Sequence, residues 1–254
     1  MRAEADLSDD AVLGGRLRLL QPRRGHRFGH DAILLAAAVA AKAGDRGVEL
    51  GAGVGAAGLA LAARVPGLSL TLVEIDPALT ALARENAKRN GLGERVTACC
   101  LDIAAPVEAF AAAGLMPASV DVVLTNPPFN DPARHITSPD RERRVAHVGG
   151  SLAPWLQVAV RLLRRQGSLA LIFRADGLAD VLRLLSADFG SLAIVPVYPR
   201  PASPAIRVIV SAVKGGRGPL TLRPALVLND DKGPTADAEA VLRDGVPLPT
   251  ATSE

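Results

Sequence analysis

Short apolar runs alternate with longer helix-forming stretches through most of this chain. Each run is rich in valine, leucine or isoleucine and is bounded by charged or turn-forming residues. Such runs, separated by helix-forming stretches, are typical of parallel strands that are buried on both faces and joined by crossover helices. The strand-like runs are residues 48–50, 70–73, 95–101 and 122–124, and the helix-forming stretches between them are 56–64, 77–90 and 104–114. The pattern predicts an α/β domain with a mostly parallel central sheet.

The second half of the chain continues this alternation and then breaks it. A helix is predicted over 151–164, with Trp155 on its packing face, and is followed by a fifth strand over 167–173 and a helix over 177–187. Two further strands are then predicted, over 192–197 and 206–213. The turn between them is rich in proline and is too rigid and too short for a crossover helix. These last two of seven strands are therefore expected to pair antiparallel.

The two ends of the chain differ from this core. Residues 1–45 are expected to form an irregular or hairpin-like lead-in and a helix that packs on the core. Residues 46–213 hold the alternating elements and form the main domain. Residues 214–254 are expected to form a strap, extended over 219–229, and a polar tail with one short helix over 236–242.

A strongly helix-forming stretch, residues 32–40, lies just before the first strand of the main domain. Asp31 is expected to cap its start, because a side-chain acceptor satisfies the free backbone N–H groups there. The alternative is that this segment faces a ligand, with Phe28 or His30 in contact with it.

Composition narrows the class of protein. With 254 residues, 49% of them hydrophobic, the chain can form one α/β domain with a full core. The two cysteines, Cys99 and Cys100, are adjacent, which suits neither a disulfide framework nor a metal site and indicates a reducing compartment. The longest apolar run, residues 32–41, is too short to span a bilayer, and no secretory signal precedes it. We therefore expect a cytoplasmic protein without a membrane partner.

Charge permits a polyanionic partner without requiring one. The formal net charge is +3 and the isoelectric point is near 9.2. Aromatic residues make up only 3% of the chain, which argues against a broad base-stacking surface. If a base is stacked, we expect one base in one pocket.

The residues after the fourth predicted strand carry the most distinctive chemistry. Pro127 and Pro128 end the strand over 122–124, because neither can donate a ladder hydrogen bond, and they stiffen the backbone after Asn126. The Asn126 side-chain carbonyl and the Pro127 backbone carbonyl are two acceptors, and Phe129 adds a flat apolar face. This set suits a planar NH2 group, such as the exocyclic amine of adenine or the side-chain amide of glutamine.

Such a nitrogen is a poor nucleophile, because its lone pair is delocalised into the adjoining π system. Two acceptors that hold its hydrogens out of plane, opposite a methyl donor, would localise the lone pair without a strong base. The alternative is a strand that ends in a proline turn, with Phe129 in the core.

A glycine-rich turn joins the first predicted strand to its helix. Gly51, Gly53 and Gly55 stand at alternate positions and would let the backbone pass close to a ligand at the helix N-terminus. A tight strand-to-helix turn would also explain them. Glu74 stands at the tip of the second strand, where an acid can accept both ribose hydroxyls of a nucleoside cofactor.

Both NAD and S-adenosylmethionine carry such a ribose, and two details favour the second. The turn lacks the third glycine of the dinucleotide fingerprint, with Ala56 and Ala57 in its place. Glu49 also puts a negative charge near the position of a pyrophosphate, whereas a carboxylate suits a cofactor with an amino group and a sulfonium. Asp102, after the third strand, could bond the adenine amine; the alternative is a helix cap or a solvated loop acid.

The order and spacing of these motifs resemble one protein family. Residues 51–55, Glu74, Asp102 and the Asn-Pro-Pro-Phe sequence resemble class I S-adenosylmethionine-dependent methyltransferases of the Asn-Pro-Pro-Tyr/Phe group. Within that group the chain is similar to the bacterial small-domain methyltransferase family that contains the valine-tRNA adenine N6-methyltransferases.

The resemblance covers residues 20–213. The segments 28–35 and 137–142 resemble the family's sequences before the first strand and after the Asn-Pro-Pro motif. Two positions depart from the family pattern, since Phe129 stands where Tyr is common and His30 stands where Thr is usual. The second change leaves the role of the segment around His30 open.

The resemblance implies a Rossmann-like fold with strand order 3-2-1-4-5-7-6, mostly parallel with the last strand antiparallel. It also implies that S-adenosylmethionine lies over the glycine turn, with its ribose on Glu74 and its adenine near Asp102, and that no metal takes part. The acceptor amine would sit between Asn126, Pro127 and the Phe129 ring. The cofactor-binding residues expected on this basis are Glu49, Gly51, Gly53, Gly55, Glu74, Ile75, Asp102, Ile103 and Asn126, and the expected catalytic residues are Asn126, Pro127 and Phe129.

For the acceptor, the resemblance favours adenine N6 in tRNA or another structured RNA. The alternative within the same chemistry is a protein glutamine amide, as in release-factor-modifying enzymes. A small-molecule O-methyltransferase, an NAD-binding oxidoreductase and a cofactor-binding module without catalysis are further alternatives.

A long loop is predicted over 130–150, directly after the motif. Its arginines could hold phosphates of a nucleic acid. Acidic residues in the same loop offset part of their charge, so a solvated surface loop is the alternative. The candidate substrate-binding residues are Pro128, Arg134, Arg141 and Arg144.

Overall fold

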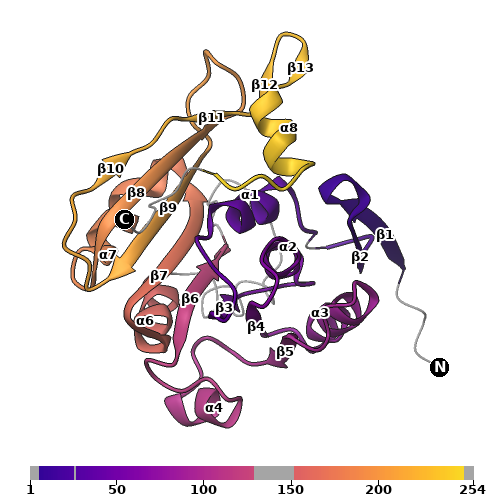
Figure 1. Cartoon of the computed structure of the whole chain (residues 1–254), viewed down its shortest axis with the longest axis vertical. Coiled ribbons are helices and arrows are strands. Elements are labelled where there is room, and N and C mark those ends of the chain that lie inside the picture. The colour runs from indigo at the N-terminus through magenta and orange to yellow at the C-terminus, as the bar shows by residue number, and fades with distance from the viewer. Residues whose placement is uncertain (1–5, 26, 129–151, 249–254) are drawn as a thin grey trace, which may run out of the picture.

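The computed structural model describes residues 6–25, 27–128 and 152–248 and shows an α/β fold around one large sheet (Figure 1). The strands are β1 (Leu7–Val12), β2 (Leu17–Pro22), β3 (Arg46–Leu50), β4 (Ser69–Glu74), β5 (Val96–Cys100), β6 (Val120–Thr125), β7 (Leu163–Arg174), β8 (Phe189–Tyr198), β9 (Arg207–Lys214), β10 (Thr221–Leu222), β11 (Leu226–Val227), β12 (Asn229–Asp230) and β13 (Gly233–Pro234). The helices are α1 (His30–Ala38), α2 (Ala56–Arg64), α3 (Pro77–Arg89), α4 (Val107–Ala112), α6 (Ala153–Leu162), α7 (Leu178–Leu185) and α8 (Ala236–Leu242), with short 3-10 turns η1 (Leu13–Gly15) and η3 (Ala175–Gly177).

Seven strands of the main sheet lie in the order β5-β4-β3-β6-β7-β9-β8. Counted along the chain from β3, this is the predicted order 3-2-1-4-5-7-6, and the prediction is confirmed. The pairs β5·β4, β4·β3, β3·β6 and β6·β7 are parallel, whereas β9 runs antiparallel to both β7 and β8. The carboxyl ends of the parallel strands therefore meet at one edge of the sheet, next to the point where β9 begins.

Helices cover both faces of this sheet, because its strands are apolar on both sides. Val122 and Leu124 of β6 face the core beneath α1, α2 and α3, whereas Val123 faces the core beneath α4, α6 and α7. All three side chains are almost completely buried. The continuous apolar run that predicted a strand buried on both faces thus has the expected environment.

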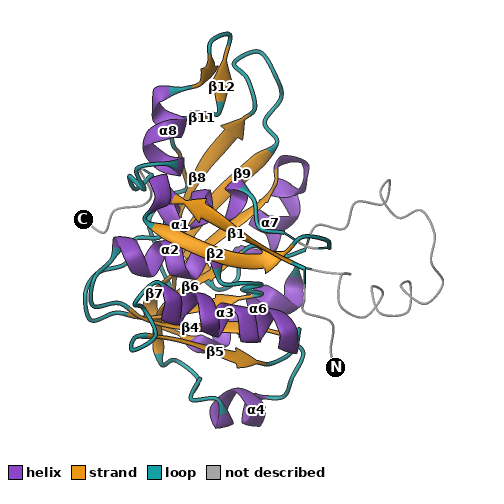
Figure 2. Ribbon diagram, turned by 90° about the vertical axis from the view of Figure 1, so that its right-hand side faces the viewer, coloured by secondary structure: helices purple, strands orange, loops and turns teal. Residues whose placement is uncertain are grey.

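The lead-in forms the hairpin β1·β2, which packs on α3 (Figure 2). The buried Asn86 side chain of α3 holds it, because Asn86 accepts from the Leu20 N–H and donates to the Leu20 carbonyl and to the Val54 carbonyl of the glycine turn. Near the other end of the chain, the predicted strap adds β10 and β11 to the free edge of β8, and the predicted helix is α8.

One local prediction was wrong. Asp31 does not cap α1, because the capping residue is Gly29 and no side chain caps this helix. The Asp31 carboxylate instead accepts a hydrogen bond from Arg207 Nε at 2.8 Å, which ties the start of α1 to the start of β9. The predicted loop over 130–150 lies outside the described residues.

No helix in the described part of the chain is long and apolar enough to cross a membrane.

Candidate functional site

Two adjoining cavities lie where the parallel strands end. The larger has a volume of about 560 Å³ and the smaller about 260 Å³. Residues from the turns after β3 and β6 and from the first turn of α3 line both cavities. The shared residues are Gly51, Gly53, Leu79, Asn126 and Pro128.

The glycine turn between β3 and α2 is held tightly by its own backbone. The amides of Gly51 and Ala52 both donate to the Val73 carbonyl at 2.9 Å, and Gly55 donates to Ala52 at 2.8 Å. Gly51 has a φ of 71° and Gly55 a φ of 88°, a left-handed backbone that favours glycine. An added Cβ at Gly51 would lie 2.7 Å from the Trp155 ring, so glycine is also required there for space.

Glu74 is fixed beside this turn at the end of β4. Its carboxylate accepts from the Gly53 N–H at 2.7 Å with one oxygen and from the Asp76 N–H at 2.9 Å with the other. The side chain is buried but lines the smaller cavity. An acid oriented by two backbone amides is a preorganised acceptor for hydroxyl groups.

The smaller cavity combines apolar walls with two acidic side chains. Ile75 follows Glu74, is 45% exposed and contributes an apolar surface to the cavity wall. Leu101 and Ile103 add apolar walls, and the Asp102 carboxylate between them accepts from the Ala104 N–H at 2.8 Å. Asp102 is thus both the local turn acid that the alternative described and a residue of the cavity.

Glu49 lies deeper, at the floor of the larger cavity. It is 3% exposed and accepts from the Gly58 N–H of α2 at 2.7 Å. The close approach requires a glycine in α2, because a Cβ at Gly58 would lie 2.6 Å from the Glu49 carboxylate. The pKa of Glu49 is raised to about 8, chiefly by burial and also by the nearby Glu74 charge, against the lowering effect of the Gly58 hydrogen bond.

Asn126 stands at the wall that the two cavities share. Thr125 before it donates its hydroxyl to the Leu50 carbonyl at 3.0 Å and so fixes the end of β6 beside the end of β3. Asn126 is half-buried, and within the described residues its side-chain amide makes no hydrogen bond. Pro127 is buried and, in the same part of the chain, its carbonyl accepts no backbone hydrogen bond. Within the described residues, two acceptors therefore lie at the larger cavity without a protein donor.

The segment before α1 and the ends of β7 and β9 form the remaining walls of the larger cavity. Phe28 lines it, whereas His30 is exposed and is not among the lining residues. The buried Gln21 side chain positions Phe28 by accepting from its N–H at 3.0 Å. Arg174 and Arg207 also line this cavity, and no feature of the local sequence singled them out.

Trp155 and Leu79 were not predicted as site residues, but the structure places both at the smaller cavity. Trp155 is 7% exposed, which agrees with a packing face, and its ring also forms part of the cavity wall next to Gly51. A lone aromatic residue on an apolar helix face gives no sequence signal of this second role.

Of the five remaining predicted site residues, the structure describes one. Phe129, Arg134, Arg141 and Arg144 lie outside the described residues. Pro128 is exposed and lines both cavities. Within the described residues, no group of three or more His, Cys, Asp or Glu side chains could hold a metal ion.

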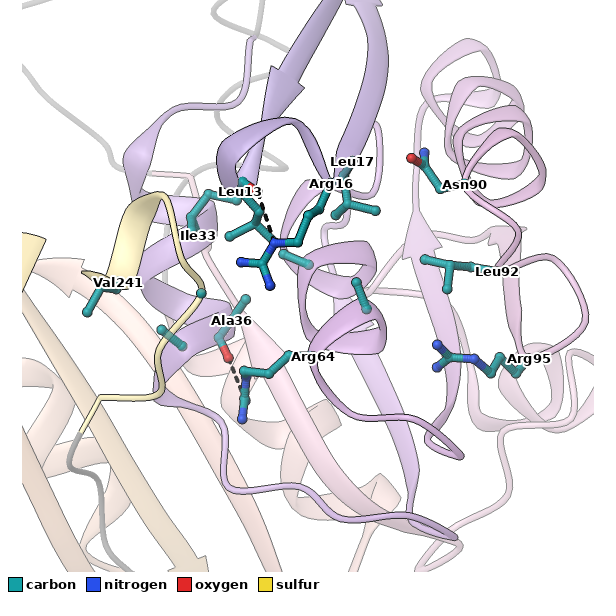
Figure 3. A pocket seen from close by; sticks show the side chains of 14 residues that line it. Leu13, Arg16, Leu17, Ile33, Ala36, Arg64, Asn90, Leu92, Arg95 and Val241 are labelled. Carbon is teal, nitrogen blue, oxygen red and sulfur yellow. Dashed lines mark hydrogen bonds between the residues drawn. The ribbon is translucent and has the colours of Figure 1, made fainter. Parts of the chain in front are cut away.

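A third cavity, of about 310 Å³, lies at the opposite ends of α1 and α2 (Figure 3). Two of its arginines donate hydrogen bonds to backbone carbonyls near the helix ends. Arg64 donates to the Ala36 and Val39 carbonyls where α1 ends, and Arg95 donates to carbonyls that include that of Ala62, near the end of α2. These positive charges offset the negative ends of the helix dipoles, which gives the two arginines a structural role.

Comparison with known proteins matches the sequence of this chain to one family. A sequence profile of the methyltransferase small domain matches residues 27–196. A tRNA1(Val) (adenine(37)-N6)-methyltransferase from Aeromonas hydrophila is 30% identical over 200 residues, which cover 74% of this chain and 77% of that protein. An enzyme of the same name from Porphyromonas gingivalis is 32% identical over 170 residues, or 64% of each chain.

A release factor glutamine methyltransferase from Chlorobaculum tepidum is also similar, with 30% identity over 159 residues that cover 59% of this chain and 53% of that protein. The chain thus spans about half of that relative and just under two thirds of the Porphyromonas gingivalis one. Among solved structures, a predicted O-methyltransferase from Agrobacterium tumefaciens has a TM-score of 0.73 and 28% identity, covering 88% of this chain and 100% of that chain.

Proposed function

Because this chain belongs to the methyltransferase small domain family and uses S-adenosylmethionine, we propose that it methylates a planar exocyclic amine, namely adenine N6 in a structured RNA such as tRNA. Membership of a methyltransferase family favours methyl transfer over the two other functions considered, an NAD-binding oxidoreductase and a cofactor-binding module without catalysis. The observation that carries the proposal is the position of two acceptor residues, since Asn126 lines both cavities and Pro127 lines the larger one, and neither acceptor has a donor among the described residues.

The cofactor fits the residues present. The smaller cavity would hold its adenosine, with the ribose hydroxyls on Glu74, the ring against Ile75 and Ile103, and the ring amine at Asp102. Its amino acid portion would extend past Gly51 and Gly53 into the larger cavity, toward the buried carboxylate of Glu49. When bound, the cofactor supplies a methyl group on a positively charged sulfur.

The chain's own contribution to the reaction is positioning. The Asn126 side-chain carbonyl and the Pro127 carbonyl accept the two hydrogens of the acceptor amine and hold the nitrogen lone pair toward the cofactor. Because Thr125 and the rigid prolines fix both acceptors before substrate binds, little reorganisation is needed in the transition state. No strong base is required, because the nitrogen attacks through its lone pair. After transfer the methylated nitrogen is positively charged and therefore acidic, and it gives one of its hydrogens to solvent as a proton.

Two features favour adenine in RNA over a protein glutamine. The relatives from Aeromonas hydrophila and Porphyromonas gingivalis are named for adenine N6 in tRNA. Three arginines, Arg27, Arg174 and Arg207, line the larger cavity, which suits an acceptor that carries phosphate. The Chlorobaculum tepidum relative, named for glutamine methylation, makes a protein amide the rival acceptor.

The experiment is methyl transfer from labelled S-adenosylmethionine to total RNA and, in parallel, to total protein from cells that lack this enzyme. We expect label in small RNA, recovered as N6-methyladenosine. Label confined to a protein band would show glutamine methylation instead, and label in neither fraction would point to a small-molecule acceptor.

The residue test is Asn126→Ala, which removes the side-chain acceptor. We expect transfer to be abolished while the affinity for S-adenosylmethionine stays within a few-fold, because Glu74 and the glycine turn are untouched. Asn126→Asp is the matched variant that keeps a side-chain acceptor oxygen, and it should retain more activity than the alanine variant. Near-normal turnover in Asn126→Ala would remove Asn126 from the mechanism.

A further inference from the structure

Two arginines face each other across the antiparallel pair β7·β9. Arg174 is the last residue of β7 and Arg207 the first of β9, and the register places them directly opposite each other. Like charges in opposed positions destabilise a strand pair. The two positive charges therefore need acidic partners at the edge where the parallel strands end.

Acidic residues from other elements hold both guanidinium groups. Arg174 makes a two-point contact with Asp176, with nitrogen-to-oxygen distances of 2.8 and 2.9 Å. Arg207 contacts Asp31 at the start of α1, also at 2.8 Å. Each arginine keeps roughly 30% of its side chain exposed. A guanidinium has five N–H donors and can hold a carboxylate and a phosphate at the same time.

Both arginines line the larger cavity together with Asn126, and neither lines the smaller one. The larger cavity has about twice the volume of the smaller, although the amino acid portion of S-adenosylmethionine is smaller than its adenosine. The larger cavity therefore has space for part of an acceptor beyond the cofactor. The arginines lie in the wall of that space.

Resting on the function proposed above, we propose that Arg174 and Arg207 bind the phosphate of the acceptor nucleotide while Asn126 holds its base. Arg174 and Arg207 are already paired with Asp176 and Asp31, and the phosphate would add to these contacts at the exposed part of each side chain. A glutamine side chain on a protein carries no such anion, so this pair of arginines is a specificity determinant for nucleic acid.

The test compares Arg174→Gln, Arg207→Gln and the double variant with the unmodified enzyme, using the RNA that the enzyme methylates. Arg183→Gln is the matched control, because Arg183 lies on α7 in an exposed ion pair with Asp180 and outside both cavities. The measurements are the KM for RNA, kcat, the Kd for S-adenosylmethionine and the dependence of the RNA KM on salt concentration.

We expect each site variant to raise the KM for RNA by about tenfold or more, since a charged hydrogen bond is lost in each. The double variant should also reduce the slope of log KM against log salt by about 0.7 to 0.9, the value for one phosphate contact. The Kd for S-adenosylmethionine should stay within a few-fold, which confirms that the site remains folded. The control should match the unmodified enzyme throughout.

Three results would overturn the inference. An unchanged KM and salt slope in the double variant would show that the arginines do not contact phosphate. A large rise in the Kd for S-adenosylmethionine would show that the pair supports the cofactor site instead. Failure of the unmodified enzyme to methylate RNA would refute the proposed function itself, and this inference with it.

Discussion

Glu49 should make the stability of this protein depend on pH in the neutral range. Its carboxyl is almost completely buried between β3 and α2, and burial raises its pKa to about 8 from an ordinary value of 4.5. Between these two values the folded chain binds a proton that the unfolded chain does not. The stabilisation from this proton is complete below pH 4.5. It falls steadily as the pH rises from 4.5 and is lost once the pH has passed through 8.

The size of the effect follows from the same two values. Each pH unit contributes about 1.4 kcal/mol, so the whole interval amounts to about 5 kcal/mol. At pH 8 half of the folded molecules have lost the proton on Glu49. Between pH 6 and pH 8 the free energy of unfolding should fall by about 2 kcal/mol. That change is a large fraction of the stability of an ordinary domain.

Urea unfolding at pH 6, 7 and 8 measures this change. Glu49→Gln is the informative variant, because glutamine keeps the acceptor for the Gly58 N–H and cannot lose a proton. Its free energy of unfolding should lack the fall of about 2 kcal/mol that the unmodified chain shows. Glu85→Gln, on the exposed face of α3, is the matched control and should behave like the unmodified chain.

The reasoning fails if the unmodified chain and Glu49→Gln show the same pH dependence. That result would mean that Glu49 is ionised in the folded protein well below pH 7, with the Gly58 hydrogen bond outweighing the cost of burial. Titrating histidines cannot imitate the expected result, because they are the same in both chains and cancel in the difference.

Cofactor binding gives the same residue a second readout. If the cationic groups of S-adenosylmethionine approach Glu49, they favour its ionised form, and binding at pH 7 should release close to one proton. Calorimetry in buffers of different ionisation enthalpy counts that proton. Glu49→Gln should release none, and an equal count in both proteins would separate Glu49 from the cofactor site.

Two further predictions concern the glycine turn and the third cavity. Gly51→Ala should cost about 2 to 4 kcal/mol of stability, because it puts an alanine in a left-handed backbone and brings its Cβ to 2.7 Å from the Trp155 ring. Gly53→Ala should cost only about 1 to 2 kcal/mol, because its backbone is also left-handed but its Cβ would have no atom within 4 Å. Thermal unfolding distinguishes the two variants, and equal losses would refute the packing argument. Arg64→Gln should lower the free energy of unfolding by about 1 to 3 kcal/mol through lost contacts at the end of α1, with methyl transfer unchanged; a selective loss of activity would give this cavity a functional role.

The strand order was predicted from the resemblance to a methyltransferase family, whereas local signals predicted which strands run parallel and which antiparallel. Crossover helices force parallel neighbours, and the proline-rich turn near residue 200 forces the antiparallel pair β8·β9. Contacts between distant segments could not be predicted in this way. The role of Asp31 depends on Arg207, which lies far along the chain, so the helix-capping rule gave the wrong partner. Asn86 likewise gives no local sign that it holds the hairpin.

The candidate site shows the same division. Gly51, Glu74 and Asn126 each end or follow a predicted strand, so the sequence placed them at one edge of the sheet, where the cavities lie. Arg174 and Arg207 also stand at strand ends on that edge. Both are arginines among many in this chain, and only the register of β7 and β9 shows that they face each other.

The glycine turn itself explains why a dinucleotide does not suit this fold. In dinucleotide-binding proteins, free backbone amides at this turn receive a pyrophosphate. Here the amides of Gly51 and Ala52 donate to Val73, Gly53 donates to the Glu74 carboxylate, and Gly55 donates to Ala52. Glu49 lies beneath the same turn and lines the cavity in front of it. A pyrophosphate would meet occupied donors and acidic side chains, whereas the sulfonium and ammonium groups of the cofactor favour the ionised form of Glu49 and are attracted to it.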